Sequence, residues 1–144
     1  MTESSHEYNL TNAIKTCKNL CSIECFDDNP HRNIIPQIAD FFTNLTELSL
    51  FIHYDLSNCD ELLSKIFHNN RKLKLIKLTN FRSLTGKCFL HLNEAAIEHI
   101  ALDEPINIQK EYLIKSWSIF KNLHILELKR FDMCLHDSLE NAQV

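Results

Sequence analysis

The chain has 144 residues, of which 44% are hydrophobic, and its formal net charge is −4 at pH 7. This length corresponds to one domain with enough apolar side chains to build a core. The acidic balance argues against a nucleic-acid partner, which calls for a basic patch. The single glycine, Gly86, excludes the glycine-rich loops that bind phosphates and dinucleotides. Neither a signal peptide nor an apolar run of about 18 residues is present, so we expect a cytoplasmic or nuclear protein without membrane contact.

The N-terminal part is expected to change from disordered to helical and then to extended. Residues 1–9 are polar and are predicted to be disordered or frayed. A helix with Thr11 as a possible N-cap is then indicated by apolar residues at helical spacing, namely Leu10, Ala13, Ile14 and Cys17. A strand over 21–25 and a loop follow. A second helix is predicted from the apolar stripe of Ile34, Ile35, Ile38, Phe41 and Phe42.

Strands and helices alternate along the rest of the chain. Further strands are expected over 46–50, 74–78, 98–102 and 124–128. Further helices are expected over 59–68, 85–92 with Thr85 as N-cap, 109–119 and 137–142. The helix over 109–119 is predicted to bury Tyr112, Leu113, Trp117 and either Phe120 or Ile119.

Each expected strand carries the same short pattern, apolar-x-x-apolar-x-apolar. Its five copies begin at Leu20, Leu45, Leu73, Ile97 and Leu123, and are 25, 28, 24 and 26 residues apart. This pattern and period are typical of a leucine-rich repeat, in which a strand and a return helix form one unit. Parallel pairing needs a crossover, and each unit has room for one. We therefore predict an α/β leucine-rich repeat solenoid over residues 10–144, with a concave parallel sheet and outer helices.

The third copy is the most specific. The stretch from Leu73 to Leu92 resembles the cysteine-containing leucine-rich repeat, with Leu84-Thr85-Gly86 in place of Ile-Thr-Asp and Phe81 in place of the cysteine. This subtype is common in F-box/leucine-rich-repeat receptors. The resemblance implies that the repeats hold a substrate protein for ubiquitin-mediated degradation, while an N-terminal F-box docks Skp1 of a cullin (SCF) ubiquitin ligase.

The chain also departs from that family. No F-box is visible before the first strand, so we expect Skp1 and cullin as partners only if a longer form carries one. The chain begins and ends within the repeat pattern, so we interpret it as a fragment of a longer receptor or as a short relative without a docking module. The position after each strand is irregular, and its two phenylalanines predict a packed aromatic spine: Asp28, His53, Phe81, Pro105 and Phe131.

The predicted binding surface is the concave face of the sheet, formed by the residues between the apolar positions. Phe26 and Phe51 are expected to be neighbours, either as exposed anchors for a partner or tucked under the following loops. Asp103 and Glu104 should lie beside Lys129 and Arg130, as a recognition site or as cross-strand ion pairs. The expected partner-binding residues are Glu24, Phe26, Glu47, Ser49, Phe51, Leu75, Lys77, Thr79, His99, Asp103, Ile125, Glu127 and Lys129.

Catalysis has little support in the sequence. The six cysteines lack the spacing of a zinc site, and Cys25 occupies a core position. Cys88 and His91 are three residues apart, as a nucleophile and base could be, but no oxyanion hole or orienting carboxylate is evident. We predict a non-catalytic protein-binding module without metal or cofactor, monomeric within a complex. The alternatives are a repeat scaffold unrelated to ubiquitination and an enzyme using Cys88.

Overall fold

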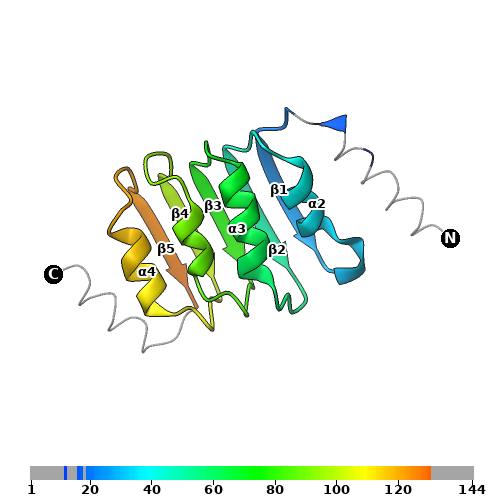
Figure 1. The fold of residues 1–144 in the computed structure, drawn as a ribbon. Helices are drawn as coiled ribbons and strands as arrows, with labels where there is room; N and C mark the ends of the chain where they lie inside the picture. Colours follow the sequence, from blue (N-terminus) through cyan, green and yellow to red (C-terminus); the bar gives the residue numbers. More distant parts are fainter. Residues whose placement is uncertain (1–11, 13–15, 18, 131–144) are drawn as a thin grey trace.

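The computed structural model of the protein describes residues 12, 16, 17 and 19–130. It shows an α/β fold built on a five-stranded, all-parallel sheet whose strand order follows the chain (Figure 1). Each strand begins one residue later than the sequence predicts, and all five predicted strands are confirmed. They are β1 (Ser22–Asp27), β2 (Glu47–Ile52), β3 (Leu75–Thr79), β4 (His99–Asp103) and β5 (Ile125–Lys129).

The helices that connect the strands lie together on one face of the sheet (Figure 1). They are the 3-10 helix η1 (Pro30–Arg32), α2 (Ile34–Phe41), α3 (Cys59–Asn69), the 3-10 helix η2 (Lys87–His91) and α4 (Lys110–Trp117). The predictions for α2, α3 and α4 are confirmed. The expected helices over 10–17 and 137–142 fall largely or wholly outside the described residues, as does Phe131.

A helix lies within the predicted range 85–92, but it is not an α-helix and the predicted N-cap at Thr85 is wrong. The segment forms a short 3-10 helix, and Gly86, with φ 95°, occupies the N-cap position. The physical reason is a contact from the preceding unit. The carboxylate of Asp60 accepts hydrogen bonds from the backbone N–H and hydroxyl of Thr85 and from the backbone N–H of Cys88. These bonds hold the start of η2 in place, and the Thr85 hydroxyl also accepts a long hydrogen bond from the backbone N–H of Lys87, at 3.4 Å.

The core lies between the sheet and the helices. Alternate residues of the central strands point toward the helices and stand in register across the sheet, so they form continuous columns. These side chains are at most 2% exposed: Leu48, Leu50, Ile52, Ile76, Leu78, Ile100 and Leu102. The helical layer contributes Ile38, Leu63, Phe67, Phe89 and Leu113, each at most 1% exposed. Burial of these apolar surfaces is the main term that stabilises the fold.

The end of the core at α4 matches the predicted set only in part. Leu113 is fully buried, whereas Tyr112 and Trp117 are half-buried. Of the two alternatives for the last position, Phe120 packs against the core and Ile119 is 38% exposed. Within residues 19–130, Phe81 is the one aromatic ring buried at the predicted spine position, because His53 at that position is exposed.

Neighbouring units are also joined by side-chain amides that bond to backbone carbonyls. Asn70, Asn80, Asn93 and Asn122 each donate from Nδ2 to a carbonyl oxygen of the preceding unit, at 2.6 to 2.9 Å. The main contacts between elements run from each strand to the next and from each helix to the next. The units therefore stack in a row, and each is held mainly by its two neighbours.

Candidate functional site

The candidate site is the face of the sheet opposite the helices, which we call the open face. The strand register sets its side chains in three columns: Ser22, Glu47, Leu75, His99 and Ile125; Glu24, Ser49, Lys77, Ala101 and Glu127; Phe26, Phe51, Thr79, Asp103 and Lys129. All residues predicted to bind a partner are in these columns, and each is half-buried or exposed. The residues predicted to bind a partner therefore lie on one face of the sheet, as the strand pattern predicts.

Three rings form a cluster at one end of the open face, which we call the aromatic platform. Phe26 and Phe51 are register partners on β1 and β2, and their rings stack with centroids 4.8 Å apart and planes at 12°. This separation matches the spacing of neighbouring strands, so the backbone itself sets the stacking distance. The ring of His53 meets both phenylalanines edge-on, at 5.3 and 4.8 Å.

The platform is open to solvent. Phe26 is 58% exposed, and Phe51 is half-buried. The alternative that both rings tuck under the following loops is therefore wrong for Phe26. A large apolar ring in this position is uncommon away from interaction surfaces, because its exposure has a free-energy cost that contact with a partner would remove.

Charge is distributed unevenly over the open face. Glu24 and Glu47 lie on β1 and β2, and in the described part of the chain neither carboxylate has a cationic group within ion-pair distance. On β5, Glu127 contacts the His99 ring at 3.1 Å. The hydrogen bond with His99, and then the positive charges of His99, Lys129 and Lys77, lower the pKa of Glu127. The β1–β2 half of the face is thus acidic, and the β3–β5 half carries the lysines.

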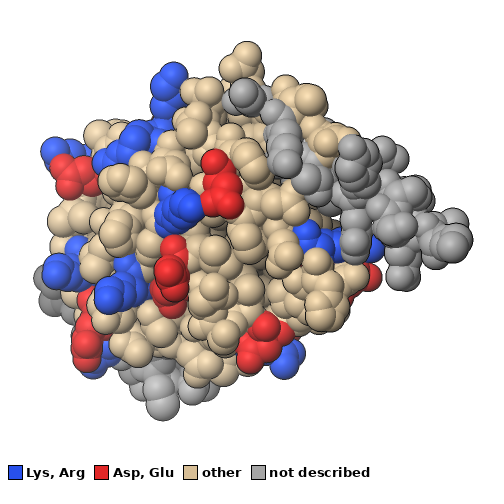
Figure 2. All heavy atoms as spheres, turned by 45° about the vertical axis from the view of Figure 1, so that its right-hand side comes forward, with Lys and Arg blue, Asp and Glu red and all other residues tan. Residues whose placement is uncertain are grey.

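The face of the molecule drawn in Figure 2 does not show such a separation of charge. In the view of Figure 2, acidic and basic residues lie interspersed over a surface that is mostly neither. That view contains no extended basic patch of the kind that nucleic-acid backbones require.

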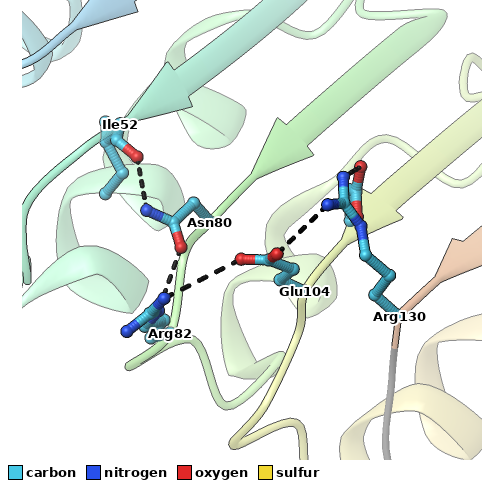
Figure 3. A network of polar contacts seen from close by, with 6 residues as sticks. Ile52, Asn80, Arg82, Glu104 and Arg130 are labelled. Carbon is cyan, nitrogen blue, oxygen red and sulfur yellow. Dashed lines mark hydrogen bonds and ion pairs between the residues drawn. The ribbon is translucent and has the colours of Figure 1, made fainter.

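A chain of polar contacts follows the edge of the sheet where the strands end (Figure 3). Asn80 donates to the carbonyl oxygen of Ile52 at 2.7 Å and accepts from Nε of Arg82 at 3.0 Å. Arg82 lies 4.0 Å from the carboxylate of Glu104, which in turn is 3.3 Å from Arg130. The sequence did not indicate Asn80 or Arg82, because their contacts come from neighbouring units.

The backbone at this edge is unusual. Asn80, Glu104 and Arg130 each follow directly after a strand and have φ values of 68°, 60° and 51°. Residues with a Cβ rarely adopt this left-handed region, at a cost of roughly 1–2 kcal/mol per residue. The turn ends each strand and positions the side chains of Glu104 and Arg130 toward each other (Figure 3).

The predicted ion pairs between β4 and β5 are present. Arg130 binds both carboxylate oxygens of Asp103, at 2.8 and 2.7 Å, and it also contacts Glu104. The hydrogen bonds between Arg130 and Asp103 lower the pKa of the Asp103 carboxyl and raise the pKa of the Arg130 guanidinium. Lys129 lies opposite Asp103 in the strand register, but among the described residues it forms no ion pair with Asp103. Because Arg130 is largely exposed, solvent screens these pairs and each contributes little to stability.

A surface pocket of about 270 Å³ connects the aromatic platform with the polar edge. It is lined by Phe51, His53, Thr79, Asn80, Arg82, Glu104 and Arg130. An apolar wall and a polar wall meet in it, an arrangement that suits a side chain with an apolar body and a polar tip. The pocket lies beside the face that the strand pattern predicts.

The thiols are placed for packing. Cys88 is fully buried, and burial raises its pKa well above the ordinary range, with the charge of Asp60 adding to the effect. Burial likewise raises the pKa of Cys59 to about 12. His91 is exposed. Since the thiolate is the nucleophilic form, the alternative of a Cys88–His91 catalytic pair lacks support from the structure.

The part of the chain that the structure describes lacks two further kinds of feature. No group of three or more His, Cys, Asp or Glu side chains there could hold a metal ion. No helix there combines the length and hydropathy needed to cross a bilayer. Comparisons with family models, with curated proteins and with solved structures found no significant match.

Proposed function

We propose that this chain is a non-catalytic protein-binding module that holds a partner protein on the open face. The observation that carries the proposal is the stacked pair of Phe26 and Phe51, presented to solvent on a sheet face that no described helix covers. Aromatic side chains of this kind supply much of the binding energy at protein interfaces. The adjoining pocket adds depth where a partner side chain can insert.

We further propose that the fold is a leucine-rich repeat solenoid. Five copies of one apolar pattern coincide with five parallel strands in chain order, and the return helices share one face. Repeat proteins of this class commonly bind other macromolecules on an extended surface. The fold alone does not determine the partner, so the argument rests on the open face.

For the biological setting we propose substrate recognition in an F-box/leucine-rich-repeat ubiquitin-ligase receptor, in the cytoplasm or nucleus. This part of the proposal is supported by the sequence of the third repeat and requires a longer form with an F-box. It is tested by purifying the endogenously tagged protein and measuring its mass and bound Skp1. Bound Skp1 on a product larger than 16.9 kDa supports receptor function. A 16.9 kDa product without Skp1 refutes it and favours a scaffold outside ubiquitination.

The binding role itself is tested with the double substitution Phe26→Ala and Phe51→Ala. We expect proteins that co-purify with the tagged chain to be depleted at least tenfold, while the melting temperature falls only slightly because Phe26 is mostly exposed. Ile114→Ala is the matched control, since Ile114 is an apolar side chain, 40% exposed, on α4. Unchanged capture by a folded double variant would refute the role of the open face.

A further inference from the structure

The aromatic platform has one carboxylate next to it, and a second one lies further along the same face. Glu24 precedes Phe26 by two residues on β1, so the two side chains lie on the same face with about 6.7 Å between their Cα atoms. Glu47 lies on the neighbouring strand, opposite Ser22, and accepts a hydrogen bond from its hydroxyl at 3.2 Å. Both glutamates are exposed, and among the described residues neither has a lysine or arginine partner.

The ring of Phe26, like the carboxylates, attracts a positively charged group. One face of the ring stacks on Phe51, and β1 is the first strand of the described sheet, so no described strand covers its other side. The face of an aromatic ring carries partial negative charge and attracts cations, arginine more often than lysine. The ring of Phe26 and the carboxylate of Glu24 therefore favour a positively charged ligand at one place, and Glu47 extends the negative charge along the face.

The other half of the open face favours the opposite charge. Lys77 and Lys129 stand on β3 and β5, and the carboxylates of Asp103 on β4 and Glu127 on β5 contact Arg130 and His99. A basic segment would therefore be attracted less strongly there than to β1 and β2, where both carboxylates have no cationic partner among the described residues. This difference fixes where on the face such a segment binds.

We propose that β1 and β2 bind an arginine-bearing segment of the partner protein, an inference that rests on the binding role proposed above. The planar guanidinium stacks on Phe26 and pairs with Glu24, because this group can both lie flat on a ring and donate two hydrogen bonds to a carboxylate. An apolar side chain beside the arginine packs against Phe51. Glu47 adds negative charge that attracts the segment.

The test is a titration of the ¹⁵N-labelled 144-residue chain with terminally blocked peptides, in which binding is monitored through the amide chemical shifts. The probe contains two arginines, one on each side of a leucine. Matched peptides carry lysine or glutamate in place of both arginines. We expect the arginine peptide to shift the amides of residues 22–27 and 47–52. It should bind at least threefold more tightly than the lysine peptide, and the glutamate peptide should leave these amides unshifted.

Glutamate-to-glutamine variants test the contribution of the carboxylates. Glu24→Gln with Glu47→Gln should weaken binding of the arginine peptide at least fivefold, while Glu111→Gln, which removes an exposed carboxylate on α4 outside the open face, should leave its affinity unchanged. Equal affinity of the arginine and glutamate peptides, or arginine binding at β3–β5, would overturn the inference. So would the absence of any shift on the open face at millimolar peptide. The binding role is judged separately by partner capture in the Phe26→Ala and Phe51→Ala variant.

Discussion

The side chain of Asn70 joins two units of the protein, and its removal should be costly. Asn70 is 1% exposed and stands at the end of α3. Its Oδ1 accepts from the backbone N–H of Leu45 at 2.9 Å, and its Nδ2 donates to the carbonyl oxygens of Phe42 and Ile66 at 2.9 and 2.8 Å. We predict that Asn70→Ala destabilises the fold by about 2–4 kcal/mol.

The magnitude follows from counting the groups left without a partner. The carbonyl of Ile66 still accepts from the backbone N–H of residue 70, so it stays satisfied. The N–H of Leu45 and the carbonyl of Phe42 lose the bonds that the side chain provides. A buried polar group without a partner costs about 1–3 kcal/mol, and the substitution leaves two such groups. The substitution also removes the cost of burying the asparagine amide away from water, so the net loss falls in the predicted range.

Urea unfolding followed by far-ultraviolet circular dichroism measures this change. The matched control is Asn69→Ala, because the neighbouring asparagine is half-buried and donates one bond, to the carbonyl of Ala39 at 3.2 Å. It should lose less than about 1 kcal/mol. A loss below about 1 kcal/mol for Asn70→Ala, with an unchanged dependence on urea, would refute the reasoning, since water would then have replaced the side chain at no cost.

Three further predictions concern the core, the thiols and the response to acid. Phe81→Ala should lower the free energy of unfolding by about 3–5 kcal/mol, because the ring is 2% exposed; a loss near zero would contradict its place in the core. A thiol reagent should modify the exposed Cys21 in the native protein and Cys88 only after unfolding, and rapid native modification of Cys88 would be inconsistent with its burial. Arg130 lowers the pKa of Asp103, so the stability this pair contributes is present above the unfolded pKa of about 3.9 and is lost as pH falls through the lower folded value. Asp103→Asn should therefore reduce the loss of stability below about pH 4 in urea unfolding, and an unchanged acid profile would count against the pair.

The strands and the open face could be predicted from sequence because their signal is local. An apolar residue at every second position fixes which side chains enter the core, and alignment of the five copies with one another predicts the register between strands. Phe26 and Phe51 were therefore expected as neighbours before any coordinates. Their exposure was left open, because it depends on what covers the end of the sheet and on the path of the following loops.

Contacts between units could not be predicted from the local patterns. The short helix η2 departs from its apolar pattern because Asp60, 25 residues before Thr85, binds its first turn. The pairing of Glu104 with Arg130 depends on left-handed backbone at both residues, for which neither residue type gives a signal. The pocket beside the platform is built from these same turns, so it could not be expected from the strand pattern.

The stacking of units in a row has a consequence for how the protein opens. Because each element contacts mainly its neighbours, loss of the first or last strand removes support from one further unit only. Opening should therefore begin at the ends, where Ile23 and Leu126 are half-buried, and progress inward. Amide hydrogen exchange would then be fastest in β1 and β5 and slowest in β3. Since the aromatic platform lies on β1 and β2, a ligand bound there would slow exchange at one end of the row and leave the other end unprotected.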